Sequence, residues 1–387
     1  SHDNPNPMPM WRNSGYTPVA RDHLVESKVC GSCHTVFTHT LDEDGARTGH
    51  KMPEQTPYLE WRNSEFNDEV ASPGPNAASC ADCHMASVDA DGNAIQTQLA
   101  HNPSGGDFGP GAAPVRSKYR RHLFVGGNTF LPALLRDNAT ALRPNAPASA
   151  FDATIAAARD MLTTRTAQVS IAGQARAGDD LRFDVRVENL AGHKFPSAFP
   201  SRRAWLRVRV RNAAGAVVFA SGEHDARGRL TGPGGTLLAG ETAGGPIYAH
   251  LDEISSADRV QVYEPVMADP AGAATYGLMR AASFLKDNRL LPRGWSAAHP
   301  EAARVGPRGA AASDADFVGG RDDVSYRVSA PAAAGPYTVE VDLLYQVLGA
   351  RYADELFQHD TREIASFKKM YDAASVVPEP VAHAEET

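Results

Sequence analysis

The sequence predicts an α+β protein of more than one domain, with a mostly helical and loop-rich N-terminal domain, an antiparallel β-sandwich and a C-terminal helix. The chain has 387 residues, which is enough for two or three domains of about 150 residues each. Short apolar stretches with helical spacing occupy the first part of the chain, whereas residues 167–348 show apolar and polar side chains in alternation. We therefore expect domains at 1–166, 167–350 and 351–387.

The composition excludes several classes of protein. Lys and Arg number 38 against 46 Asp and Glu, a net charge of −8 with His neutral, whereas nucleic-acid-binding proteins usually carry a basic face. Hydrophobic residues make up 42% and charged residues 22%, which are ordinary values for a globular protein. No apolar run approaches the ~18 residues that would suggest a membrane span. We expect neither a nucleic-acid partner nor a transmembrane segment.

Three helices are predicted in the N-terminal domain. The pair Thr56-Pro57 combines a cap residue with proline at the first helical position. A second helix is expected at 129–136, where apolar residues cluster. A third is expected to begin at Ser149, because Ser149 and Asp152 resemble a capping box and apolar residues follow on one face.

The sandwich prediction depends on a period of two. Apolar and polar side chains alternate over 181–188 and 206–211, and the pattern returns at 337–341. A sheet with one buried face produces such alternation, and several strands of this kind predict an immunoglobulin-like sandwich. Segments 221–258 and 270–320 are too irregular for core strands, so we expect them to be excursions from the sandwich.

The chain is predicted to close with a helix and a tail. Asp360 and Glu363 are expected at the helix start, and Ile364 and Phe367 form part of an apolar stripe. The last ten residues are expected to form a mobile tail, as chain ends often do.

All four cysteines fall in two copies of one motif, Cys30-Gly31-Ser32-Cys33-His34 and Cys80-Ala81-Asp82-Cys83-His84. Cys-x-x-Cys-His is the attachment pattern for c-type haem. Two thiols at this spacing can form thioethers to one porphyrin, and the histidine that follows binds the iron as its proximal ligand. The sequence therefore predicts two covalently bound c-type haems, held by Cys30, Cys33, Cys80 and Cys83, with His34 and His84 as iron ligands.

Other uses of the cysteines stay open. Two Cys-x-x-Cys pairs can form a tetrathiolate zinc site, but here the pairs begin fifty residues apart, beyond the usual ribbon spacing of roughly 15–20. A redox dithiol needs no histidine at the next position. Two disulfides would each close a tight, strained loop.

Fourteen histidines are present, so twelve lie outside the motifs and can supply the second axial ligands. The candidates, in order of preference, are His122, His193, His23 and His250. The ordinary alternative for each is a capping, turn or surface histidine. Met85 adjoins His84 on the proximal side and is excluded as a ligand to the same iron. Arg202 and Arg203 are candidates to pair with haem propionates, the alternative being a solvent-facing strand start.

Several stretches together resemble exported multihaem c-type cytochromes of the cytochrome c554 type. They are Cys30–Thr35, Glu54–Trp61, Cys80–Met85, Gly192–Pro196, Ser201–Leu206, Val260–Glu264 and Lys286–Leu290. The resemblance implies electron transfer outside the cytoplasm through low-spin, bis-His haems, with redox proteins or other cytochromes as partners. Many relatives carry more haems than the two motifs here, which argues against a long wire within one subunit.

The expected location is the periplasm or the cell surface. The polar, proline-rich residues 1–20 resemble a mature N-terminus from which an export signal has been removed. The expected function is an electron carrier or relay rather than an enzyme. Two alternatives are kept: a haem enzyme, such as a peroxidase or a nitrogen- or sulfur-oxide reductase with one open iron, and a subunit of a surface cytochrome assembly or filament, which would make the chain a homo-oligomer.

Overall fold

The computed structural model describes residues 11, 12, 14–19, 21, 23, 26–89, 91–98, 115–116, 120–331 and 334–387. Residue contacts divide the chain into two compact units. Unit 1 comprises residues 1–33 and 66–125, and unit 2 comprises residues 34–65 and 126–387. Among the described residues, no helix is both long enough and apolar enough to cross a membrane.

The described elements of unit 1 are short. They are α2 (Ser27–Gly31), α4 (Cys80–His84), and the antiparallel pair β3 (Thr97–Gln98) and β4 (Val115–Arg116). The Ser27 hydroxyl accepts a hydrogen bond of 2.9 Å from the backbone N–H of Cys80, so α2 lies against the start of α4. The helices are single turns, and the expected helical N-terminal domain is not evident in this unit.

Unit 2 begins with a β-hairpin where helices and loops were expected. Strands β1 (Val36–Leu41) and β2 (Arg47–Gln55) pair antiparallel. The turn between them is held by Asp42, whose side chain accepts from the backbone N–H groups of Asp44 and Ala46. Met52 of β2 is fully buried with Met267 and Ala281, so its side chain anchors the hairpin to the rest of unit 2.

The predicted N-terminal helices are present in unit 2. Helix α3 (Pro57–Arg62) starts after Thr56 with proline in its first turn, as predicted. Helices α5 (Phe130–Asp137), α6 (Ala139–Leu142) and α7 (Ala148–Arg165) follow. The capping box predicted at Ser149 is wrong: Pro147 is the N-cap of α7, and Asp152 pairs with Arg136 instead.

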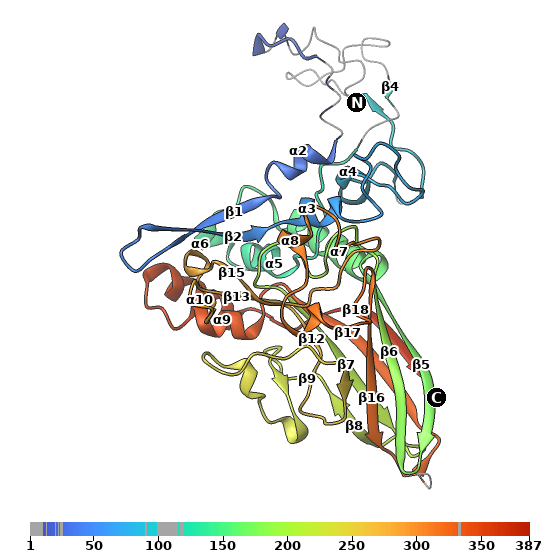
Figure 1. The fold of residues 1–387 in the computed structure, drawn as a ribbon. Coiled ribbons are helices and arrows are strands. Elements are labelled where there is room, and N and C mark those ends of the chain that lie inside the picture. Colours follow the sequence, from blue (N-terminus) through green and yellow to red (C-terminus); the bar gives the residue numbers. More distant parts are fainter. Residues whose placement is uncertain are drawn as a thin grey trace. The chain divides into compact units, whose positions relative to one another are not determined.

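Unit 2 contains the two largest sheets of the described residues (Figure 1). The first has the order β11-β16-β6-β5 and contains β5 (Ala167–Ala177), β6 (Asp180–Asn189), β11 (Glu253–Ile254) and β16 (Arg321–Ser329). Its strands pair antiparallel except for β11 and β16, which are parallel. Strand β5 begins at the residue where the alternating pattern was predicted to begin.

The second sheet has the order β12-β7-β17-β18, and β8 pairs with the other edge of β7. Its members are β7 (Arg203–Arg211), β8 (Val217–Ser221), β12 (Val262–Tyr263), β17 (Thr338–Gln346) and β18 (Glu379–Glu386). All of these pairings are antiparallel.

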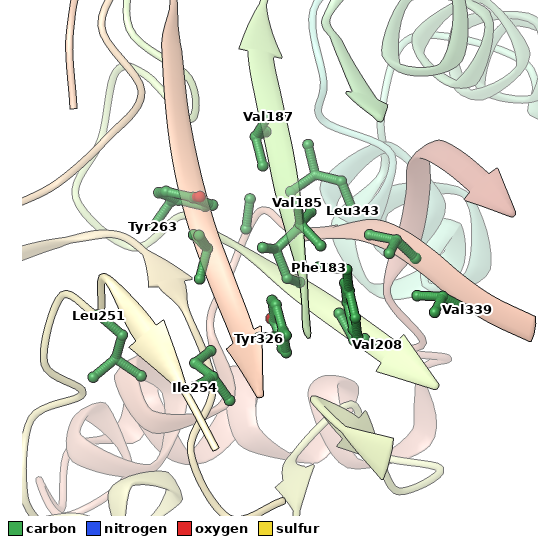
Figure 2. Close-up of a cluster of buried hydrophobic side chains, with 14 of the residues drawn as sticks. Phe183, Val185, Val187, Val208, Leu251, Ile254, Tyr263, Tyr326, Val339 and Leu343 are labelled. Atoms are coloured by element: carbon green, nitrogen blue, oxygen red, sulfur yellow. The ribbon is translucent and has the colours of Figure 1, made fainter. Parts of the chain in front are cut away.

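Both sheets contribute to one hydrophobic core (Figure 2). Every second residue of β6 from Leu181 to Val187 is buried, as the alternation predicts. The Phe183 and Tyr326 rings stack with their centroids 5.2 Å apart, joining β6 to β16. The structure thus has two mainly antiparallel sheets around a shared core, and the more specific immunoglobulin-like assignment stays a prediction.

Short elements occupy the irregular segments. They are β9 (Glu223–His224), β10 (Leu230–Thr231), η2 (Pro233–Gly235), η3 (Ala239–Glu241), β13 (Pro265–Ala268), β14 (Ala274–Thr275), η4 (Leu278–Arg280), β15 (Ser283–Asp287), α8 (Ala302–Val305) and η5 (Gly309–Ala312). Strands β9 and β10 pair with each other, and β14, β13 and β15 form a separate three-stranded sheet. Segment 270–320 is therefore outside the two main sheets, as expected, whereas segment 221–258 contributes the short strand β11 to the first of them.

The C-terminal prediction is half right. Helices α9 (Ala350–Leu356) and α10 (Arg362–Ala373) are present, and Thr361 caps α10 by accepting from the backbone N–H of Ile364. The predicted mobile tail is wrong, because residues 379–386 form β18 along β17. Backbone hydrogen bonding and the burial of Val381 order this polar segment.

Four charged side chains are buried together in unit 2. Lys194 donates to the Asp287 carboxylate at 2.7 Å, and Arg289 contacts both Asp287, at 2.7 Å, and Glu60, at 3.2 Å. Glu60 also accepts from the backbone N–H of Lys194 at 3.1 Å. Burial opposes ionisation of Asp287, but Arg289 and Lys194 hold its pKa at about 2. We call this set the buried ion network.

We expect Lys194→Met to destabilise unit 2 by about 3–5 kcal/mol, because it leaves two buried carboxylates, Asp287 and Glu60, with the single cation of Arg289. Urea unfolding followed by far-UV circular dichroism measures the change. Lys368→Met is the control, since Lys368 forms an ion pair at 2.6 Å with Asp372 but is half exposed; exposed pairs contribute about 0–1 kcal/mol. Equal unfolding midpoints for the two variants would contradict the structural role of the network.

Candidate functional site

The second cysteine motif forms helix α4 itself. Ser79 accepts from the backbone N–H of Asp82 at 3.2 Å, and the Asp82 carboxylate accepts from the backbone N–H of Ser79 at 2.8 Å. This reciprocal capping box satisfies two N–H groups that the helix leaves unpaired. Residues three apart lie on one helix face, so the cap holds Cys80 and Cys83 on the same side of a short helix.

Arg120, from a segment that follows the motif in sequence, contacts helix α4. Its guanidinium donates to the carbonyl of Ala81 at 2.8 Å and pairs with the Asp82 carboxylate. Partial burial opposes ionisation of Asp82, but the hydrogen bonds from Ser79 and Arg120 lower its pKa overall. The motif is therefore fixed by side chains on both sides of its sequence.

The ring of His84 is oriented by the main chain. Its Nδ1 lies 2.5 Å from the carbonyl oxygen of Val125. A carbonyl can only accept, so Nδ1 carries the proton and Nε2 carries the lone pair of the neutral ring. Histidines that bind metals usually donate their other ring N–H in this way. His84 is thus in the tautomer that an iron ligand requires.

The first cysteine motif lies beside the second. Cys30 is in α2, and the backbone N–H of Cys33 donates to its carbonyl at 3.1 Å. Burial raises the pKa of the Cys80 thiol to about 11, and its contact with the Cys30 thiol contributes in the same direction. The attachment cysteines of the two motifs therefore adjoin within unit 1. His34 is the first residue of unit 2, where its carbonyl accepts from the backbone N–H of Tyr58 at 3.3 Å.

The structure distinguishes between the alternative roles of the cysteines, which are disulfides, a zinc site and haem attachment. All four are free thiols, so neither motif forms a disulfide. Across the described residues, which include every cysteine, no group of three His, Cys, Asp or Glu ligand atoms within 4.8 Å contains a thiol. A tetrathiolate zinc site is therefore not assembled. Partly or fully exposed thiols on two short helical segments fit covalent attachment of a group that lies outside the helices.

Two of the predicted distal ligands, His122 and His23, lie in unit 1 and are exposed. His122 belongs to a segment that runs beside the end of α4: Arg121 donates to the carbonyl of Ala86, and Val125 to that of His84. The ring of His122 packs near Phe124, with centroids 5.6 Å apart. This segment is bonded to the Nδ1 side of His84, opposite to the nitrogen that would bind iron.

His193 lies in unit 2 on a well-anchored loop. Its Nδ1 is 2.8 Å from the carbonyl of Lys194, which leaves the lone pair on Nε2 as in His84. Asn189 donates to the His193 carbonyl at 2.9 Å, and Glu60 of α3 accepts from the next backbone N–H. Since α3 also bonds to His34 through Tyr58, both histidines are tied to the same helix.

His250 does not fit a distal ligand. It is buried, its Nδ1 accepts from Gln261 and Asn288, and its Nε2 lies 2.7 Å from Asp314. Both ring nitrogens therefore have protein partners, and the prediction that His250 faces an iron is wrong.

Arg203 does not fit a propionate partner either. Its guanidinium is buried and contacts both oxygens of Glu241, at 2.7 and 2.9 Å. Arg202 is partly exposed and donates to the carbonyl of Ser197 at 2.7 Å, so it keeps the predicted role as a proposal.

Sequence reasoning missed the residues that orient the motifs. The pair Ser79 and Asp82 has capping-box spacing and could have been found by that pattern. Arg120 and the carbonyl of Val125 come from about forty residues away, and no local pattern indicates them.

No family model matches the chain, and no match is found among curated proteins. Among solved structures, the crystal structure of a penta-heme cytochrome c552 from Thermochromatium tepidum is similar over 92% of this chain and 76% of its own. The sequence identity is 14% and the TM-score is 0.36. At this level of similarity, the function has to follow from the chain's own residues.

We expect Ser79→Ala to loosen α4, because loss of an N-cap costs about 0.5–2 kcal/mol. Hydrogen exchange measured by mass spectrometry should become faster in the peptide that contains Cys83 and His84. Ser87→Ala, an exposed serine just beyond the helix, is the control and should leave that peptide unchanged. Unaltered exchange in Ser79→Ala would show that the cap does not hold the motif.

Proposed function

We propose that this chain is a di-haem c-type cytochrome that carries or relays single electrons outside the cytoplasm. The observation that carries the proposal is the pair of complete Cys-x-x-Cys-His motifs, whose first cysteines, Cys30 in α2 and Cys80 in α4, adjoin. The orientation of the His84 ring supports it independently, because nothing in the cysteine spacing requires Nδ1 to be protonated.

Each motif residue has one role in this proposal. Cys30 and Cys33 hold one haem and Cys80 and Cys83 the other, while His34 and His84 are the proximal ligands. When bound, the haems supply the one-electron chemistry. The chain supplies attachment and orientation: the capping box positions the thiols of α4, and the Val125 carbonyl selects the tautomer of His84.

The contact between α2 and α4 favours a relay. The Ser27–Cys80 hydrogen bond and the Cys30–Cys80 contact bring the two attachment points together. Groups attached at adjoining cysteines are held in proximity by the chain, so an electron that enters at one can pass to the other without a change of fold.

The distal ligands are assigned from ring geometry. His193 is the first choice, since a backbone carbonyl fixes its lone pair on Nε2 and its loop is rigidly bonded. His122 is three residues before Val125, whose carbonyl contacts Nδ1 of His84 and not the nitrogen that would bind iron, so we do not assign His122 to the haem on Cys80 and Cys83. If His122 is a ligand, it serves the haem on Cys30 and Cys33. His23 is the third candidate.

The proposed location is the periplasm or the cell surface, where c-type haem is used, and the proposed partners are redox proteins or other cytochromes. If both irons carry two protein ligands, neither can bind a substrate. The chain then acts as a carrier and not as an enzyme.

We expect the exported holoprotein to be heavier than the polypeptide by two haems in intact-mass spectrometry. Replacing both Cys80 and Cys83 by serine should remove one haem and halve the pyridine haemochrome absorbance per chain. Ser32→Ala, which changes a residue between the cysteines of the first motif, is the control and should keep two haems. A wild-type protein purified with bound zinc and without haem would overturn the proposal.

We expect both ferrous irons of the wild type to resist carbon monoxide, because histidines occupy both axial positions. His193→Ala should convert one haem from low spin to high spin and allow prompt carbon monoxide binding, seen in the absorption spectrum. His359→Ala, an exposed histidine near the C-terminus, is the control. An unchanged low-spin spectrum in His193→Ala would exclude this ligand, and prompt binding in the wild type would favour the enzyme alternative.

A further inference from the structure

A second cluster of ionisable side chains lies in unit 2, apart from the cysteine motifs. Three separate segments supply it: Asp252 comes just before β11, Asp314 and Asp316 follow η5, and Asp322 is on β16. One carboxylate oxygen each from Asp252, Asp314 and Asp316 lies within 4.8 Å of the others. Asp322 and His250 share the same spacing with Asp314.

A buried carboxylate oxygen of Asp322 is independent evidence that this cluster binds an ion. Its side chain is 0% exposed, and its Oδ2 accepts from the Tyr263 hydroxyl at 2.7 Å and from Gln261 at 3.0 Å. Its Oδ1 is buried without a hydrogen-bond partner. A buried, unsatisfied carboxylate oxygen is costly, and an ion is one of the standard reasons for finding one.

His250 orients the cluster instead of binding metal itself. The backbone N–H of Leu251 donates to Gln261 Oε1 at 2.8 Å, which points Gln261 Nε2 toward His250 Nδ1 at 2.9 Å. Since Nδ1 accepts, Nε2 carries the proton and donates to Asp314 at 2.7 Å. A histidine that holds a ligating carboxylate in this way is a common second layer around a metal.

The negative charges of the cluster favour binding of a cation. Asp252, Asp314 and Asp316 each place a carboxylate oxygen within 4.8 Å of the others, and like charges this close to one another repel. Asp252 is exposed and Asp314 and Asp316 are partly exposed, so an ion has a path from solvent.

We propose that Asp252, Asp314, Asp316 and Asp322 bind a hard divalent cation of the calcium class, with His250 as a positioning residue. The ligands are carboxylate oxygens, and calcium takes six to eight oxygens in flexible geometry, often including water and backbone carbonyls. Zinc instead favours sulfur and nitrogen ligands in a tetrahedral site. The ion would tie the segment before β11 and the 314–316 loop to the core strand β16. This inference does not depend on haem.

The test is calorimetric titration of the chelator-treated full-length holoprotein with calcium chloride, alongside its melting temperature. We expect one site per chain and a higher melting temperature with calcium. Loss of even a residue that orients a ligand weakens metal binding about 10- to 100-fold, so Asp316→Asn should weaken it at least as much. Asp252→Asn, at an exposed position, is the second variant should Asp316→Asn fail to fold.

Asp269→Asn is the matched control. Asp269 accepts from the backbone N–H groups of Ala271 and Ala273 in a turn, as Asp314 accepts from that of Asp316 at 3.1 Å, but it lies outside the cluster. Calcium affinity should be unchanged in this variant. Absence of calcium binding by the wild type, or wild-type affinity in both Asp316→Asn and Asp252→Asn, would overturn the proposal. Binding of zinc chloride without calcium binding, lost in His250→Gln, would overturn the all-oxygen assignment.

Discussion

The buried ion network of Lys194, Asp287, Arg289 and Glu60 is the constraint on which the rest of unit 2 depends. It joins helix α3, the loop that carries His193 and the end of β15, segments that are far apart in sequence. The opposite charges offset the cost of removing each from water, and loss of any one leaves an unbalanced charge in the interior. The position of His193 is therefore set by electrostatics in the interior and not by its own loop alone.

Sequence patterns predicted correctly those helices and strands whose formation depends on neighbouring residues. The period of two located β6, β7 and β17 because one face of each strand meets the core. The Thr56-Pro57 pair located α3 because proline fits the first turn of a helix. The hairpin at 36–55 and strand β18 were missed, because both are ordered by pairing with other strands. Their partners are not visible in their own sequence.

At the candidate site, too, contiguous motifs could be predicted and contacts with distant residues could not. The cysteine motifs are contiguous and could be read directly, whereas the choice among histidines depends on what each ring nitrogen contacts. The sequence ranks His193 above His250 without showing what either ring contacts. In the structure Asp314, Gln261 and Asn288 occupy both nitrogens of His250, and a carbonyl orients His193. Arg203 was a candidate propionate partner because it follows the His193 loop directly, but its carboxylate partner in the structure is Glu241, 38 residues away.

The carbonyl of Val125 has a consequence for how an iron at His84 would be tuned. A histidine that donates its Nδ1 hydrogen becomes more basic and pushes more electron density onto its metal, which favours the oxidised state. Here the acceptor belongs to the main chain, so replacing the side chain at position 125 does not remove it. The electronic character of His84 as an iron ligand would thus be set by the path of the backbone, and substitution of the neighbouring side chains would not remove this hydrogen bond.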